Sequence, residues 1–331
     1  MRRLTTLAGV AGWLVLSACA PGPVRVMLPS GVARTAAPRV IRVQVREGTA
    51  LVVREVPLEE YVGTTALSEV HPDSRDDQIA ERMFEVQAVI ARTYAVSSRG
   101  RHAKAGFDVC STTHCQLYDP SRLKTSRWAA VVRTAVQRTA GQLLWFAGGP
   151  VNAVFHADCG GHTSNAAAVW GGMAPAYLSG ATDKGPAGNA HADWTFEART
   201  AVLHAALNAD PRTAVGAKLD RIEIAGRDQA GRAEKILLRG SRTFVVRGEV
   251  FRDVVTRALG VKTLRSTLFT IKTTRAASAE ATAPRDVFVF SGKGFGHGVG
   301  LCQAGALARL RAGESPEHVL EHYFPGTSLS R

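Results

Sequence analysis

A glycine-rich segment near the C-terminus is the most informative part of this chain. It reads Gly292-Lys293-Gly294-Phe295-Gly296-His297-Gly298-Val299-Gly300-Leu301-Cys302-Gln303-Ala304-Gly305-Ala306. Glycine gives up side-chain packing and costs chain entropy, but it permits a positive φ and a close approach of the backbone to a ligand. The segment is therefore either a tight turn between a strand and a helix or one wall of a binding site. It lacks the Gly-Lys-Ser/Thr ending of a phosphate-binding loop.

The composition indicates a folded protein with a basic surface. The chain has 331 residues, 45% of them hydrophobic, which suffices for one large domain or two modest ones. Its formal net charge is +13, from 41 Lys and Arg against 28 Asp and Glu. Such an excess favours nucleic acid, anionic lipid headgroups or an anionic cell-wall polymer as surroundings. Because the arginines are spread along the chain and no nucleic-acid-binding motif occurs, we expect no nucleic-acid partner.

The N-terminus has the pattern of a lipoprotein signal peptide. Two arginines precede a short apolar run over residues 4–16, and Leu16-Ser17-Ala18-Cys19 follows. The run is too short to span a bilayer, but it has the length of a signal-peptide core. We expect residues 1–18 to be removed, Cys19 to be lipidated, and residues 19–38 to be a linker from the membrane. An alanine after the cysteine resembles the signal for outer-membrane sorting, so the predicted location is the periplasmic side of the cell envelope, at the outer membrane.

Lipidation of Cys19 would leave four cysteines in an oxidising compartment, and these allow three pairings into two disulfides. Cys110 and Cys115 are close in sequence and enclose His114. One interpretation is a zinc site that uses Cys110 and His114 with further ligands from elsewhere. The other is a Cys110–Cys115 disulfide, which the compartment favours.

Hydrophobic periodicity predicts an α+β fold with a mixed core of helices and sheets. Alternation over residues 40–53 predicts a hairpin, and further strands are expected at 143–146, 151–155, 222–225, 235–239, 243–246 and 287–290. Helices are expected at residues 57–72, 76–97, 126–138, 248–259, 304–312 and from 316 onward. Residues 156–195 are expected to be irregular. Residues 198–275 are expected to form a smaller α+β subdomain, inserted before the glycine-rich segment.

Glu69 is the sharpest candidate for chemistry. It shares one face of its predicted helix with Leu58, Val62 and Thr65, and it falls in the last turn. Desolvation on such a face raises the pKa of a carboxyl group, and the negative end of the helix dipole acts in the same direction. A carboxylic acid that is still protonated near neutral pH can serve as a general acid. A surface glutamate on a helix of slightly different phase is the alternative.

A second candidate cluster follows the expected strand at 151–155. It reads His156-Ala157-Asp158-Cys159-Gly160-Gly161-His162. A Cys–His nucleophilic pair is one interpretation. Against it, an exposed reactive thiol would be oxidised outside the cytoplasm.

Five motifs, taken in their order along the chain, resemble the SpoIID/LytB family, named after the sporulation stage II protein D. The resemblance runs from about residue 40 to 329. The motifs are Leu58-Glu59-Glu60-Tyr61-Val62, Ser68-Glu69-Val70, Gln87-Ala88-Val89-Ile90-Ala91-Arg92-Thr93-Tyr94-Ala95, Asp108-Val109-Cys110 with His114-Cys115-Gln116-Leu117-Tyr118, and the glycine-rich segment with Tyr323-Phe324-Pro325-Gly326-Thr327.

This resemblance implies a SpoIID-like catalytic domain over residues 39–329. It also implies a lytic transglycosylase that acts on peptidoglycan glycan strands, particularly strands stripped of stem peptides. Glu69 would protonate the glycosidic oxygen between N-acetylmuramic acid and N-acetylglucosamine, and the muramic 6-hydroxyl would attack C1 to give a 1,6-anhydro end. The residues implied for the substrate groove are Arg92, His156, Lys293, His297 and Gln303. No cofactor would be required, although zinc at the Cys/His loop of relatives keeps Cys110 and His114 as possible ligands.

Two positions depart from the family pattern. The family usually has serine where this chain has Cys159 and Cys302. Both motifs are thought to line one groove, so a Cys159–Cys302 disulfide is a hypothesis that explains both changes together.

The implied partners are glycan strands, the membrane through a lipid anchor, and an amidase or a divisome component. A noncatalytic peptidoglycan-binding or amidase-activating lipoprotein is the alternative function. A third interpretation is an adhesin for anionic polymers, driven by the positive charge.

Overall fold

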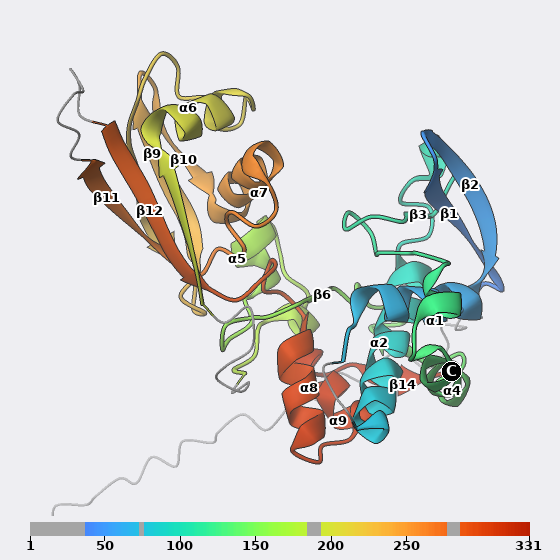
Figure 1. Ribbon diagram of the computed structural model, residues 1–331. Helices are drawn as coiled ribbons and strands as arrows, with labels where there is room; N and C mark the ends of the chain where they lie inside the picture. The colour runs from blue at the N-terminus through green and yellow to red at the C-terminus, as the bar shows by residue number, and fades with distance from the viewer. Residues whose placement is uncertain (1–36, 73–75, 184–192, 277–284) are drawn as a thin grey trace, which may run out of the picture. The chain divides into compact units, whose positions relative to one another are not determined.

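The computed structural model describes residues 37–72, 76–183, 193–276 and 285–331 (Figure 1). All of them belong to one of the two units of the chain, Arg34–Arg331. Helices and several small sheets are mixed along the chain, which confirms the predicted α+β class. The predicted signal peptide, Cys19 and the linker up to residue 36 lie outside the described residues.

The first hydrophobic core is assembled around helix α2, Asp77–Ser97. Asp76 caps this helix as its sequence predicts, because the side chain accepts the backbone N–H groups of Gln78 and Ile79 at 2.8 and 3.3 Å. In Figure 1 the C-terminal helices lie beside α2, so both ends of the domain share one core. The helices that pack on α2 are α1 (Leu58–Glu69), α4 (Ala129–Arg138), α8 (Gln303–Arg311) and α9 (Pro316–Tyr323).

Short strands and turns complete the first core. The expected N-terminal hairpin is present as β1 (Val40–Glu47) and β2 (Ala50–Pro57), and β3 (Val109–Cys110) pairs with β1 in parallel. Strand β4 (Leu143–Phe146) lies between β5 (Gly149–Pro150) and β14 (Ser328–Ser330). The remaining short elements are η1 (Ala103–Ala105), α3 (Arg122–Thr125), α5 (Ala166–Trp170) and η2 (Ala176–Leu178).

The strand expected at residues 151–155 is displaced. The hairpin partner of β4 is Gly149–Pro150, followed by a bond from the Val151 N–H to the Leu144 carbonyl oxygen at 3.0 Å. Val151 and Ala153 are buried and Val154 is half-buried, outside any strand. Strand β6 is only Phe155–His156, and it pairs in parallel with β13, Leu301–Cys302. The segment from 156 to 195, expected to be irregular, contains α5, η2 and the start of a strand.

A second hydrophobic core is built from two three-stranded sheets and two helices. The sheets have the orders β11-β12-β7 and β10-β9-β8. Trp194 and Phe290 belong to this core, so it extends beyond the range 198–275 that the sequence indicated. Its elements are β7 (Asp193–Arg199), α6 (Thr200–Asn208), β8 (Leu219–Arg227), β9 (Ala233–Gly240), β10 (Thr243–Arg247), α7 (Gly248–Leu259), β11 (Phe269–Ala276) and β12 (Arg285–Lys293).

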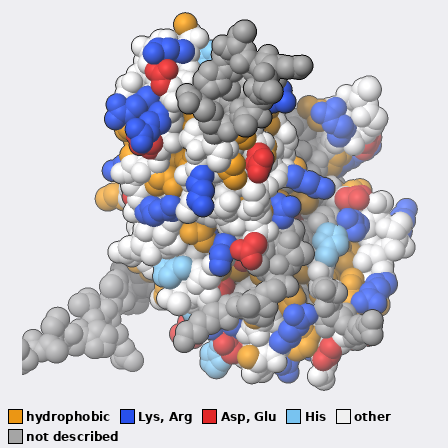
Figure 2. Space-filling model, turned by 60° about the vertical axis from the view of Figure 1, so that its left-hand side comes forward, with side chains coloured by type: hydrophobic (Ala, Val, Ile, Leu, Met, Phe, Trp, Pro, Cys, Tyr) orange, Lys and Arg blue, Asp and Glu red, His pale blue; other side chains and the backbone are white. Residues whose placement is uncertain are grey.

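The surface carries its positive charge in a dispersed form. Figure 2 shows Lys and Arg side chains distributed over one face, with acidic side chains among them. Within the described residues, no helix combines the length and the apolar character that crossing a bilayer requires.

Candidate active site

Glu69 is the last residue of α1, where the chain leaves the helix at the extended residue Val70. Burial raises the pKa of Glu69 to about 7, and a hydrogen bond from the Leu117 N–H to Oε1, 2.5 Å long, opposes this shift. A carboxyl group with that pKa holds its proton on about half of the molecules at pH 7. The structure therefore places a half-protonated acid at a helix end that solvent still reaches in part.

Residues 116–119, at the end of the Cys/His loop, are hydrogen-bonded to α1. Besides the Leu117 bond, the Asp119 N–H donates to Ser68 Oγ at 3.1 Å. Tyr61 Oη donates to Gln116 Oε1 at 2.9 Å. These contacts fix the backbone that holds the Glu69 carboxyl group. Gln116 belongs to a quoted motif, but sequence reasoning gave it no role.

Gln303 connects the glycine-rich segment to the candidate acid. It is the first residue of α8, and its Nε2 donates to the Glu69 carbonyl oxygen at 3.4 Å and to Gln87 Oε1 at 3.3 Å. Glu69 and Gln303 are 234 positions apart, so only the tertiary fold brings them together. Gln87 is a further site residue that sequence reasoning missed.

Two predicted groove histidines lie next to each other. The ring centroids of His156 and His297 are 5.4 Å apart, and the Trp170 ring lies 5.1 Å from His297. Burial lowers the pKa of His297 to about 4, and it lowers the pKa of His156 well below the ordinary value. Both rings are therefore neutral at physiological pH.

The glycines of the segment serve close backbone packing. Gly300 has φ +68°, and a Cβ there would lie 2.2 Å from the Val154 carbonyl oxygen. Gly296 has φ +107°, and a Cβ there would lie 2.7 Å from His156 Cβ. Both positions thus require glycine for conformation and for space. Packing against residues 154–160 therefore explains these two glycines without a ligand.

Arg92 and Lys293, both predicted for the groove, differ in their exposure to solvent. Arg92 is fully buried, and it donates to both carboxylate oxygens of Glu59, at 2.9 and 2.6 Å, and to the Gln142 carbonyl oxygen at 3.2 Å. Its guanidinium group is not open to a substrate in this structure, so it acts in the scaffold. Lys293 ends β12 with its side chain 64% exposed, and its Nζ lies 3.9 Å from Asp193 Oδ1.

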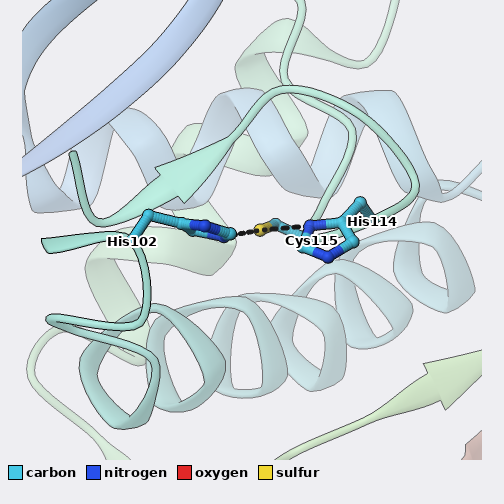
Figure 3. A group of neighbouring side chains, drawn as sticks. All are labelled: His102, His114 and Cys115. Carbon is cyan, nitrogen blue, oxygen red and sulfur yellow. Dashed lines mark hydrogen bonds between the residues drawn. The ribbon is translucent and has the colours of Figure 1, made fainter. Parts of the chain in front are cut away.

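The Cys/His loop gathers donor atoms suited to a metal ion. Figure 3 shows the Cys115 sulfur between two imidazole rings, 3.3 Å from His102 Nε2 and 3.6 Å from His114 Nδ1. Cys110 Sγ lies 3.7 Å from His114 Nδ1. Sequence reasoning missed His102, which precedes the turn η1 and stacks on Phe107 with ring centroids 4.6 Å apart. Two thiols and two imidazoles form the donor set of a structural zinc site.

The four described cysteines are free thiols, so neither predicted disulfide is formed in this structure. The Cys159 N–H donates to Cys302 Sγ at 3.2 Å, and both side chains are buried. The two motifs that the disulfide hypothesis joined are therefore side by side.

Comparisons with known proteins agree with this arrangement. Residues 46–146 match the family model described as SpoIID, Stage II sporulation protein, and residues 186–300 match a domain of unknown function, DUF8618. An uncharacterized protein of Brachyspira hyodysenteriae is 29% identical over 288 residues, which cover 85% of this chain and 68% of that protein. Stage II sporulation protein D of Bacillus subtilis is 27% identical over 295 residues, which cover 84% of this chain and 76% of that protein. The amidase enhancer of Bacillus subtilis is 26% identical over 282 residues, which cover 75% of this chain and 38% of that protein.

Proposed function

We propose that this chain, whose residues 46–146 match the SpoIID family model, is a lytic transglycosylase that cleaves peptidoglycan glycan strands, with Glu69 as its general acid and base. The observation that carries the proposal is the desolvated carboxyl group of Glu69, whose pKa is raised to about 7. An acid of this strength both donates and accepts a proton near neutral pH.

The proposed reaction needs one carboxyl group. Protonated Glu69 gives its proton to the glycosidic oxygen between N-acetylmuramic acid and N-acetylglucosamine as the C1–O bond breaks. The resulting carboxylate then takes the proton of the muramic 6-hydroxyl, whose oxygen bonds to C1 and closes the 1,6-anhydro ring. Glu69 is protonated again at the end. This route replaces the second carboxylate that hydrolytic glycosidases use.

The contacts of Glu69 favour one oxygen for this task. Oε1 accepts the Leu117 N–H, so the acidic proton belongs on Oε2. Gln303 holds the backbone of the same residue through its carbonyl oxygen. The neutral ring of His297, which is partly exposed, suits an uncharged sugar chain, because it adds no positive charge.

The Cys/His loop fits a supporting role. We propose that His102, His114 and Cys115, whose ligand atoms lie within 4.8 Å of one another, hold a zinc ion, with Cys110 as the fourth ligand because its Sγ lies 3.7 Å from His114 Nδ1. Bound zinc would contribute cross-linking of the loop rather than chemistry on the sugar. The loop leads directly to Leu117, so a fixed loop keeps the Glu69 carboxyl group in place.

The place of action follows from the N-terminus. We propose that Cys19 carries a lipid anchor on the periplasmic side of the envelope, which would hold the domain within reach of glycan strands. The formal net charge of +13 favours the approach to an anionic wall.

Purified sacculi provide the test. Wild-type protein should release 1,6-anhydro products that mass spectrometry detects, with more product after an amidase has removed the stem peptides. Glu69→Gln should release none while it still sediments with sacculi. Glu60→Gln is the matched control, because Glu60 is an exposed glutamate of the same helix. Equal product from wild type and Glu69→Gln would exclude the proposed role of Glu69.

One relative suggests a second function. It is named an amidase enhancer, and this chain covers 38% of its length. A noncatalytic domain that binds glycan and stimulates an amidase would not need an acid at position 69. In an assay with a purified amidase, wild type and Glu69→Gln would then raise peptide release equally, and neither would produce anhydro ends.

A further inference from the structure

A second set of possible metal ligands lies buried behind the glycine-rich segment. His156, Cys159 and Cys302 each offer a ligand atom within 4.8 Å of the other two. Their exposed fractions are 4%, 2% and 1%. We propose that these three residues form a metal site for zinc, distinct from the Cys/His loop. The site would join strand β6 and the turn after it to the start of α8.

His156 is prepared for this role. Its Nδ1 lies 3.1 Å from the Val299 carbonyl oxygen, which places the proton on Nδ1 and leaves the lone pair on Nε2. Nε2 is buried and has no hydrogen-bond partner among the described residues. A buried acceptor without a partner is costly. Metal-binding histidines commonly donate their other ring nitrogen to a carbonyl oxygen in this way.

Backbone N–H groups surround both sulfur atoms. Cys302 Sγ accepts from the N–H groups of Cys159 and Gly305, at 3.2 and 3.3 Å. Cys159 Sγ accepts from the Gly161 N–H at 3.2 Å. These N–H groups would support a thiolate, which is the form that binds a metal. Without an ion, burial raises the pKa of the Cys302 thiol well above its ordinary value, so the divalent cation itself would have to displace the proton. The donors belong to the backbone, so the site is built into the fold.

The charges around the set balance when a divalent ion is bound. Two thiolates and one divalent cation sum to zero, which limits the cost of burial. Arg232 adds a buried positive charge, and its Nη2 donates to the Cys159 carbonyl oxygen at 2.6 Å. The buried carboxylate of Asp183 offsets it, and Asp183 Oδ2 accepts the Cys159 S–H at 3.4 Å, a proton that a bound metal would displace.

The same geometry discriminates between a metal and a Cys159–Cys302 disulfide. A disulfide would consume both sulfurs, but it would leave His156 Nε2 without a partner. It would also weaken the N–H bonds to sulfur, because a bridged sulfur is a poorer acceptor than a thiolate. A metal ion satisfies all three side chains at once.

Counting zinc in variants of the full chain tests the proposal. After expression with zinc and dialysis against a weak chelator, elemental analysis should find one zinc per chain fewer in Cys302→Ser than in wild type. Cys115→Ser is the matched variant for the other site, and the double variant should hold none of the zinc. Serine is nearly isosteric and can still cap α8, so Cys302→Ser should fold. Its circular dichroism, and the zinc it keeps at the Cys/His loop, check this.

A second readout isolates the buried site. Cobalt added to metal-free Cys115→Ser should give a thiolate-to-cobalt charge-transfer band, which the added Cys302→Ser change should abolish. Equal zinc in wild type and Cys302→Ser would overturn the proposal. So would free thiols with no bound metal, or a Cys159–Cys302 bridge in peptide mapping without reductant.

Discussion

A Glu69→Gln substitution should stabilise the protein at alkaline pH, although it removes the proposed catalytic acid. The pKa of Glu69 rises from 4.5 to about 7 on folding because the carboxyl group is desolvated. One pKa unit corresponds to about 1.4 kcal/mol, so the full shift corresponds to about 3.4 kcal/mol. Because Glu69 is partly open to solvent, we expect a gain of about 2–3 kcal/mol in the free energy of unfolding.

The size of this stability difference depends on pH. Between pH 4.5 and 7 the folded carboxyl group keeps a proton that the unfolded chain has lost. The free energy of unfolding of the wild type therefore falls as the pH rises through this window, and it stays low above pH 7. Glutamine has no such proton. The two proteins should thus be equally stable at pH 4 and differ fully at pH 8.

Urea denaturation at pH 4, 6 and 8 measures this difference. Glu60→Gln is the control, because it makes the same change at an exposed position of α1. Comparing variants at each pH cancels the titration of all other groups. If wild type and Glu69→Gln unfold at the same urea concentration at pH 8, the carboxyl group is not desolvated, and the argument for a general acid fails.

Four further outcomes are expected. Glycan cleavage should fall about tenfold per pH unit above pH 7 as Glu69 loses its proton, and a flat pH–rate profile from 6 to 9 would contradict this. Gln303→Ala should lower kcat about 10- to 100-fold with unchanged wall binding in a sedimentation assay, since it frees the backbone of the acid. Arg92→Met should lower the free energy of unfolding by about 1–2 kcal/mol in urea denaturation, because it removes the bonds to the partly exposed Glu59 carboxylate and to the Gln142 carbonyl oxygen, and an unchanged midpoint would refute a scaffold role. His102→Ala should lose one zinc and most of the activity, whereas full activity without that zinc would show that the loop needs no metal.

Local sequence patterns predicted the parts of the site that lie on helices. The spacing of apolar residues put Glu69 on the inner face of α1, and Asp76 marked the start of α2. Both features depend on neighbours within one or two turns, so periodicity is sufficient to find them.

Tertiary contacts limited the rest of the prediction. His102 contacts Cys115 of the Cys/His loop across a turn, and no metal-ligand spacing in the sequence predicts this contact. Strands β6 and β13 have two residues each, too few for a pattern of alternation. Arg92 lies in a motif that the resemblance associated with a groove, but its side chain points into the core and binds Glu59. Motif membership alone does not tell a scaffold residue from a groove residue.

The pairing of β6 with β13 has a consequence for biosynthesis. Cys159 and Cys302 are 143 positions apart, so ribosomes that add about 5–20 residues per second need roughly 7 to 30 seconds between them. During that interval the nascent chain has Glu69 but lacks Gln303 and the helices that close over α2. A chain truncated before Gln303 would contain Glu69 but would lack the Gln303 contact to its backbone. The proposed transglycosylase would thus become competent only after the residues from Gln303 onward have been made.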